Sequence, residues 1–155
     1  RHKVRAIHPG MLALRRRDGT NWLHVQNLPA DVIQPAGEAV AAGITAVDFL
    51  EACDDEALLA ATLSLASNLA AEQATPSDDV VGVRLRLNNG LSAEADIDGA
   101  VAAFINLFNS ERTVGDCVSE FARVADAEAE QLTRDLLAIV RVFVSRGFLV
   151  PEEFE

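Results

Sequence analysis

Hydrophobic and polar residues alternate most regularly over residues 81–87 and again over residues 91–97. Alternation with a period of two is typical of a strand that buries one face. Between the two runs, Asn88-Asn89-Gly90 tolerates positive φ, and this predicts a β-hairpin. The polar positions hold two arginines on the first run and two acids on the second, so cross-strand ion pairs account for these charges without a ligand. These residues are Arg84, Arg86, Glu94 and Asp96.

Three helical patterns follow the hairpin. Asp98 stands at the N-cap position of the first helix. Thr113-Val114-Gly115-Asp116 forms a capping arrangement for the second, with Asp where Glu or Gln is usual. Asp126 opens the third and longest helix, which we expect to end at Gly147 as its C-terminal cap. Residues 148–150 then predict a short final strand.

The order of these elements over residues 80–150 predicts a winged-helix-like module. Such modules often bind DNA through the helix that here begins at Asp126. That helix starts with Asp126, Glu128 and Glu130, whereas a DNA reader presents Arg, Lys or Asn. The sequence therefore favours a protein contact, and we do not expect the acidic module to bind nucleic acid.

The first 25 residues have a different, extended pattern. The run over residues 4–14 breaks at Pro9-Gly10, Asp18-Gly19 marks a turn, and Trp22-Leu23-His24-Val25 resumes the extended pattern. Residues 4–25 are thus predicted to form a β-hairpin. Because an isolated hairpin is marginally stable, we expect this one to need another sheet edge or a helix.

The segment between the two predicted hairpins has helical composition. Residues 38–42, 45–53 and 56–69 predict short helices, interrupted at Gly43 and at Asp54-Asp55-Glu56. The stretch 58–71 is so uniformly apolar that its periodicity does not separate a buried helix from a strand. Its content of Ala and Leu favours the helix.

Together these patterns predict an α+β protein in three parts. Residues 1–28 hold the N-terminal β-hairpin, residues 29–76 a helical connector, and residues 77–155 the winged-helix-like domain with its β-hairpin, three helices and short final strand. A hydrophobic content of 50% in 155 residues is enough to bury a core.

Charge is distributed unevenly along the chain, whose formal net charge is -11. Residues 1–17 hold six of the 13 basic side chains and no acid, a charge of +6, while the remaining seven bases and 24 acids give -17. An acidic body repels phosphate backbones, so only the basic end is suited to a polyanion. Arg15, Arg16 and Arg17 at the hairpin tip are therefore candidate contacts for an anionic substrate, although a solubilising turn is the simpler explanation of them.

The sequence carries no recognisable catalytic, metal-binding or cofactor-binding motif. His2, His8 and His24 have no accompanying cluster at ligand spacing. Cys53 and Cys117 lie far apart in apolar contexts, which suits buried thiols in a reducing compartment. No run approaches the ~20 apolar residues of a membrane span, so we expect a cytoplasmic protein without a membrane contact.

Three stretches carry a resemblance to a known group of proteins. They are the hairpin Val4–Arg16 with Trp22, the run Arg84–Leu91 followed by Asp98 and an Ala-rich helix, and Thr113–Asp116 with the closing residues Arg141 and Gly147–Val150. Together they resemble the C-terminal region that follows the catalytic domain in actinobacterial S-adenosylmethionine-dependent methyltransferases related to the N6-adenine and protein-glutamine methylases.

The resemblance implies a non-catalytic accessory region, attached downstream of a domain that binds S-adenosylmethionine and transfers a methyl group to a planar nitrogen. The family's N-P-P-[YF] motif and Gly-rich cofactor loop would lie upstream of Arg1, so no catalytic or cofactor-binding residue is carried over. The first hairpin would complete the sheet of the upstream domain, and without that domain we expect the chain to self-associate. The alternatives are a stand-alone adaptor that uses the winged-helix-like module for protein contacts, and a DNA-binding regulator.

Overall fold

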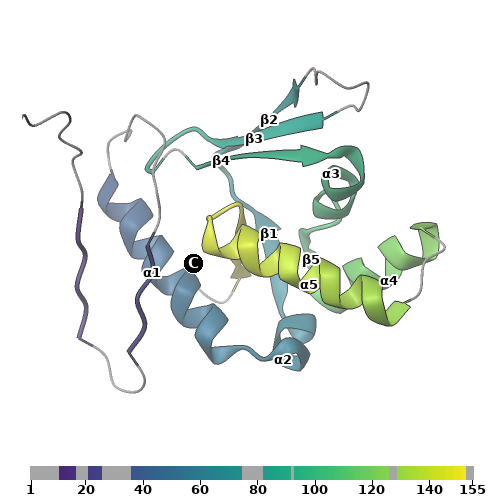
Figure 1. Ribbon diagram of the computed structural model, residues 1–155, viewed down its shortest axis with the longest axis horizontal. Helices are drawn as coiled ribbons and strands as arrows, with labels where there is room; N and C mark the ends of the chain where they lie inside the picture. The colour runs from purple at the N-terminus through teal and green to yellow at the C-terminus, as the bar shows by residue number, and fades with distance from the viewer. Residues whose placement is uncertain are drawn as a thin grey trace, which may run out of the picture.

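The structure, a computed structural model, describes residues 11–16, 21–25, 36–74, 82–91, 93–125 and 129–152. The described residues form helices and strands in the mixed order of an α+β protein, which confirms the predicted class (Figure 1). In chain order the elements are α1 Ala36–Ala52, α2 Asp55–Ala60, β1 Thr62–Leu65, β2 Leu69–Ala74, β3 Gly82–Leu87, β4 Glu94–Asp98, α3 Gly99–Ile105, β5 Asn109–Thr113, α4 Val114–Ala125, α5 Ala129–Ser145 and β6 Leu149–Pro151.

The strands form two antiparallel sheets, one in the order β2–β3–β4 and one in the order β5–β1–β6. In the first sheet the predicted hairpin of residues 82–98 is confirmed, with Arg84 opposite Asp96 and Arg86 opposite Glu94. Both arginines bind these acids as predicted, with N–O distances of 2.7 and 2.9 Å. Gly90 in the hairpin loop has φ +69°, and a Cβ there would overlap the Cβ of Ala39 in α1, so the turn packs against this helix.

The second sheet places β1 between β5 and β6. Leu63 of β1 lies opposite Pro151 of β6 and is fully buried. The register of β1 against β5 shifts at a bulge, where Ser110 has a positive φ of 65°. The Ser110 and Ser64 hydroxyls both donate to the Glu152 carboxylate and hold its pKa below the usual value. The two hydroxyls and the carboxylate thus join the three strands at this edge.

Three of the predicted caps are present in the C-terminal helices, and the fourth, Asp126 at the start of the longest helix, lies outside the described residues. The Asp98 carboxylate accepts a hydrogen bond from the Val101 N–H at 2.8 Å, at the start of α3. At the start of α4, the Asp116 carboxylate accepts from both the hydroxyl and the N–H of Thr113, while the Thr113 hydroxyl accepts from the Asp116 N–H. Gly147 has φ +77° just after α5, as expected of a C-terminal cap.

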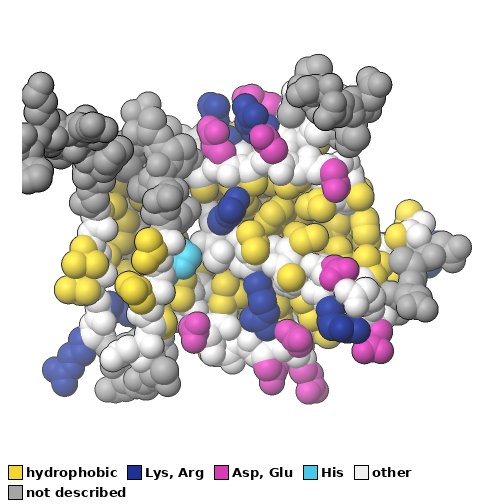
Figure 2. Space-filling view, in the orientation of Figure 1, with side chains coloured by type: hydrophobic (Ala, Val, Ile, Leu, Met, Phe, Trp, Pro, Cys, Tyr) yellow, Lys and Arg dark blue, Asp and Glu magenta, His cyan; other side chains and the backbone are white. Residues whose placement is uncertain are grey.

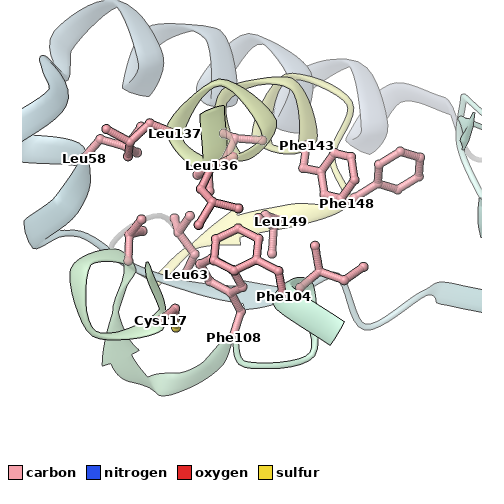
Figure 3. Packing of buried hydrophobic residues seen from close by; sticks show 14 of the residues in the cluster. Leu58, Leu63, Phe104, Phe108, Cys117, Leu136, Leu137, Phe143, Phe148 and Leu149 are labelled. Atoms are coloured by element: carbon pink, nitrogen blue, oxygen red, sulfur yellow. The ribbon is translucent and has the colours of Figure 1, made fainter. Parts of the chain in front are cut away.

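A single hydrophobic core joins both sheets to the helices (Figure 3). Phe104 is fully buried, and its ring packs edge-to-face against Phe108 and Phe121 at centroid distances of 5.2 and 5.4 Å. Leu58 of α2 and Val140 of α5 are also fully buried. Because both sheets take strands from either side of residue 76, the predicted connector and the predicted winged-helix-like segment share this core. Their boundaries at residues 28 and 76 stay predictions.

Two predictions of local structure were wrong, and one strand was missed. Residues 58–71, where a helix was favoured, hold only the end of α2 and then turn into β1 and β2, because pairing of Leu63 between β5 and β6 outweighs the helix propensity of Ala and Leu. Strand β5 was missed, since Asn-Ser-Glu-Arg-Thr has no apolar alternation. The predicted final strand is confirmed as β6, which pairs with β1. In place of short helices broken at Gly43, α1 is continuous, because a glycine costs a helix only about 1 kcal/mol and the burial of Ala46 and Phe49 outweighs this cost.

Within the residues that the structure describes, the predicted hairpin of residues 4–25 is not formed. Residues 11–16 and 21–25 are neither helix nor strand, and the rest of the hairpin lies outside the described residues. No described strand pairs with either segment, so neither segment has the inter-strand hydrogen bonds of a β-sheet.

Candidate docking surface at residues 11–25

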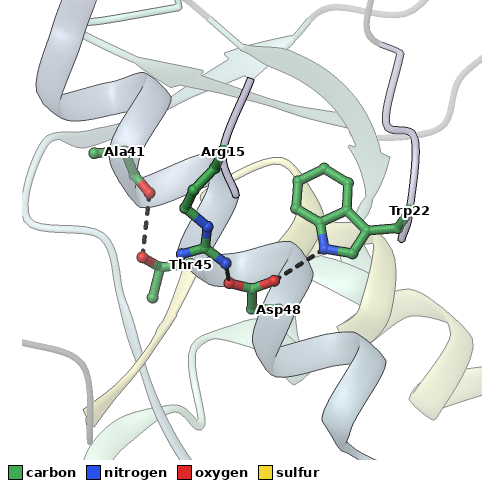
Figure 4. A network of polar contacts seen from close by, with 5 residues as sticks. All are labelled: Arg15, Trp22, Ala41, Thr45 and Asp48. Carbon is green, nitrogen blue, oxygen red and sulfur yellow. Dashed lines mark hydrogen bonds and ion pairs between the residues drawn. The ribbon is translucent and has the colours of Figure 1, made fainter. Parts of the chain in front are cut away.

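The two N-terminal segments, residues 11–16 and 21–25, run beside α1 (Figure 1). A single carboxylate of that helix holds both of them. Asp48 binds the Arg15 guanidinium through Oδ2 and accepts a hydrogen bond from Trp22 Nε1 through Oδ1, at 2.9 Å (Figure 4). The Asp48 side chain is only 24% exposed, so this anchor is partly shielded from water.

The sequence of α1 explains why Asp48 faces the segments. Ala46 and Phe49 are buried on the side of α1 that faces the core. Ala41, Thr45 and Asp48 follow one another at spacings of four and three, which places them on one stripe of the helix. Figure 4 shows this stripe beneath Arg15 and Trp22, with the Thr45 hydroxyl donating to the Ala41 carbonyl at 3.2 Å. The helix therefore has one face for the core and another for the segments.

Large apolar side chains of the two segments stand in solvent, and Figure 2 shows them projecting beside the body. Their exposed fractions run from 61% to 86%. Single exposed apolar residues are common, but five large ones on two short neighbouring segments favour an interaction surface. We call this group the N-terminal apolar surface, and it consists of Met11, Leu12, Leu14, Leu23 and Val25.

The three arginines predicted to contact an anion have different surroundings. Arg15 is bound to Asp48, so its charge is balanced within the chain. Arg16 is exposed, next to the N-terminal apolar surface, and Arg17 lies outside the described residues. The sequence reasoning missed Asp48, although an acid between Val47 and Phe49 in an apolar helix was a signal for a buried or partnered carboxylate.

Two hollows lie elsewhere on the body. The first, on α4 and β5, is polar, but its acids are engaged: Asp116 caps the helix, and Glu120 binds Arg123 at 2.8 Å. The second is a groove of about 340 Å³ under the β2–β3–β4 sheet, which we call the β2 groove. It is lined by Leu65, Ala66, Leu69, Ala71, Glu72, Gln73, Val83, Leu85, Ala102, Ile105 and Asn106.

Neither cysteine is in a disulfide. Cys53 is half-buried and Cys117 is buried. Burial raises the pKa of the Cys117 thiol, whose Sγ lies 3.5 Å from the Leu107 carbonyl oxygen. A raised pKa keeps the thiol protonated and unreactive, in agreement with the predicted structural role.

Of the three histidines in the sequence, only His24 lies in the described part of the chain, and it is exposed. His2 and His8 lie outside the described residues. Within the described ranges, no group of three or more His, Cys, Asp or Glu side chains is arranged to hold a metal ion. No helix among the described residues combines the length and apolar character needed to cross a membrane.

Comparison with known proteins yields a family but no characterised relative. No curated protein matches the chain. A family model described as "Domain of unknown function (DUF7782)" matches residues 41–151, from the middle of α1 to the end of β6. Residues 11–16 and 21–25 lie outside the matched range. Since the match covers well over half of its length, the chain belongs to the DUF7782 family of domains of unknown function.

Proposed function

We propose that this chain is a non-catalytic accessory region of an S-adenosylmethionine-dependent methyltransferase, and that it docks on the catalytic domain through the N-terminal apolar surface. The observation that carries the docking is the exposure of five large apolar side chains on segments that Asp48 holds in place. Burying one such side chain completely contributes about 1.5–3 kcal/mol, so a partner gains substantially from covering them. The methyltransferase identity rests on the sequence resemblance.

The extended backbone of residues 11–16 and 21–25 supports a particular mode of docking. Neither segment is in a sheet of the described chain, so both are available to add strands to the sheet of a partner. Arg16 beside this surface would lie near the joint between the two domains, where it could meet an anionic substrate. S-adenosylmethionine would bind in the catalytic domain, and this chain contributes no residue to it.

The winged-helix-like arrangement is part of this proposal. Its support is the chain order α3, β5, α4, α5, β6, with β1 between β5 and β6 at the centre of the sheet. Acidic residues on α5, among them Glu130 and Asp135, and the net charge of -11 favour a protein partner over DNA. A mobility-shift assay with duplex DNA at low salt should detect no complex; a salt-sensitive complex would point to a DNA-binding regulator instead.

We also place the protein in the cytoplasm. Neither Cys53 nor Cys117 is in a disulfide, as is usual in a reducing compartment. Fractionation of cells that express the full gene product should recover it with cytoplasmic markers, and recovery from an oxidising compartment would contradict the assignment.

The decisive test of the methyltransferase identity uses the full gene product. We expect an in-frame methylase segment upstream of Arg1 and binding of S-adenosylmethionine to the purified protein in isothermal titration calorimetry. A full-length protein that binds no S-adenosylmethionine would overturn the methyltransferase identity.

The docking itself is tested by substitution in the same protein. Leu12→Ser with Leu14→Ser should separate the melting of this region from that of the catalytic domain in calorimetry. Val124→Ser is the matched control, because Val124 is an exposed apolar residue of α4, which lies on the opposite side of the body from the N-terminal segments (Figure 1). Equal effects of the two changes would show that the N-terminal apolar surface is not the docking site.

The alternative, a stand-alone adaptor, predicts that the winged-helix-like module joins two copies of the chain. It would be favoured by a full gene product that begins near Arg1 and sediments as a dimer, and by persistence of that dimer in the Leu12→Ser, Leu14→Ser variant. Under the methyltransferase proposal, residues 1–155 should instead self-associate through the N-terminal apolar surface when they are separated from the partner domain, whereas a monomer at high concentration would contradict this.

A further inference from the structure

Strand β2 is an open edge of its sheet. It pairs with β3 on one side, and no strand of the described residues pairs with its other side. An exposed edge offers unpaired N–H and C=O groups to another chain. The strand carries one charged residue, Glu72, and no proline, so it has little of the protection that edge strands usually have.

The pairing with β3 determines which backbone groups of β2 point outward. The Asn88 N–H donates to the Asn68 carbonyl at 3.0 Å, and Asn68 stands opposite Asn88 just before the first pair of the ladder, Leu69 with Leu87. Hydrogen-bonded and non-hydrogen-bonded pairs alternate along an antiparallel ladder. The backbone groups of Ala71 and Gln73 therefore point away from β3, toward the open edge.

The same two residues line the β2 groove. Their side chains lie on the face of the sheet that holds Val83 and Leu85, which stand opposite them in the register. Ala102 and Ile105 of α3 form another part of the lining. A segment that paired with the edge would thus direct every second side chain toward an apolar groove.

Glu72 contributes to the groove lining at the open edge, but its position between Ala71 and Gln73 directs its side chain to the other face of β2. Its partner across β3 is Arg84, but the Arg84 guanidinium binds the Asp96 carboxylate through two nitrogens, at 2.7 and 3.1 Å. An added strand would place a side chain directly opposite Glu72 on the open side. A basic side chain at that position is electrostatically favoured, and the net charge of -11 adds to the attraction.

We propose that the edge of β2 and the β2 groove bind an extended segment of a partner polypeptide by strand addition. The segment has apolar side chains at alternate positions, which enter the groove, and Lys or Arg between them, one of which faces Glu72. This site goes beyond the docking function proposed above, because it uses a different surface and a different partner segment.

The probe for this site is a labelled Val-Lys-Val-Lys-Val-Lys-Val peptide, compared with a block isomer, Val-Val-Val-Val-Lys-Lys-Lys, of the same composition. Fluorescence anisotropy with the whole chain should give a dissociation constant about tenfold lower for the alternating peptide. Equal binding of the two isomers would mean that only charge attracts them, and would overturn the proposal.

Substitutions then test the edge and its charge. Ala71→Pro removes an outward N–H and should weaken binding of the alternating peptide about tenfold, while Ala71→Ser, which keeps the N–H and the small size, should not. Because proline could also disturb the fold, Glu72→Lys provides an independent test: it should reverse the preference in favour of a Val-Glu-Val-Glu-Val-Glu-Val peptide. An unchanged preference would contradict the proposed geometry.

A second copy of the chain is the competing occupant. Sedimentation without peptide should show that Ala71→Pro leaves the oligomeric state unchanged. If the unsubstituted chain is a dimer and Ala71→Pro makes it a monomer, the edge of β2 mediates self-association, and the proposed peptide site is wrong. Leu12→Ser with Leu14→Ser should leave peptide binding unchanged, so failure here is distinguishable from failure of the docking proposal.

Discussion

The body, from α1 to β6, and the two N-terminal segments use their hydrophobic residues in opposite ways. In the body, Leu58, Leu63 and Phe104 are fully buried in one core. In the segments, Leu14 and Leu23 are 86% and 84% exposed. The body thus buries its large hydrophobic residues within the chain, whereas the segments leave theirs exposed to solvent.

The polar contacts of the two regions also involve different residues. Within the body, Arg141 on α5 donates to the Cys53 carbonyl and to Asp55, so it ties α5 to the junction of α1 and α2. Between the segments and the body, Asp48 receives both Arg15 and Trp22. The comparison teaches that body stability and segment position rest on separate residues, which can be changed independently.

The largest expected effect comes from emptying the core of the body. Phe104→Ala should lower the free energy of unfolding by about 3–5 kcal/mol, because it removes a fully buried ring and leaves a cavity. Leu14→Ala, in the segments, should change it by less than about 0.5 kcal/mol. Urea unfolding followed by circular dichroism measures both. Similar losses in the two variants would mean that the segments belong to the core.

The next effect concerns the junction of α1 and α2. Arg141→Met keeps the aliphatic packing of the side chain but removes its hydrogen bonds to the Cys53 carbonyl and Asp55. The expected loss is about 2 kcal/mol, since these are hydrogen bonds from a charged donor. Arg134→Met is the matched control, because Arg134 is an exposed arginine of the same helix. A loss of unfolding free energy no greater than that of the control would show that Arg141 does not stabilise the junction of α1 and α2.

A smaller, pH-dependent effect is expected at the start of α4. Thr113→Ala should cost about 1 kcal/mol at neutral pH through loss of the cap. Hydrogen bonds from the Thr113 hydroxyl and N–H hold the pKa of the Asp116 carboxyl below its usual value. A lowered folded pKa stabilises the protein above the unfolded value of about 4, and this stabilisation is lost as the pH falls through the folded value.

The difference between the parent chain and Thr113→Ala should therefore shrink as the pH falls below about 4. Thermal melts between about pH 7 and about pH 2.5 cover the range in which the Asp116 carboxyl changes its charge. A difference that stays constant over this range would show that Asp116 does not contribute through its charge.

The smallest effect on stability is expected from releasing the segments. Asp48→Ala should change the free energy of unfolding of the body by less than about 0.5 kcal/mol. Trp22 is the only tryptophan of the chain, so its fluorescence reports directly on the segments. Its emission should shift to the red, because loss of the Asp48 carboxylate frees the indole into water. Glu51→Ala, an exposed acid of the same helix, should leave the emission unchanged, and an unshifted spectrum in Asp48→Ala would contradict the anchor.

Local patterns were enough to predict the β3–β4 hairpin and the three caps at Asp98, Thr113 and Gly147. In each case the signal lies within a few residues: alternation around Asn88-Asn89-Gly90, a side-chain oxygen three residues before an N–H, or a glycine after an apolar stripe. The candidate docking surface was harder to predict from the sequence. The basic tip at Arg15 was visible, but its pairing with Asp48, 33 residues away, was not.

The sequence by itself determined the elements whose stabilising contacts are local, together with the α+β class and the charge of the body. Only the tertiary structure decided that residues 62–65 are a strand and that Asn109–Thr113, with no apolar alternation, is its neighbour. It also decided that α1 passes through Gly43 without a break. The physical reason is that strand pairing and core burial draw on partners far away in the chain, whose contribution exceeds the differences of less than about 1 kcal/mol per residue in intrinsic propensity.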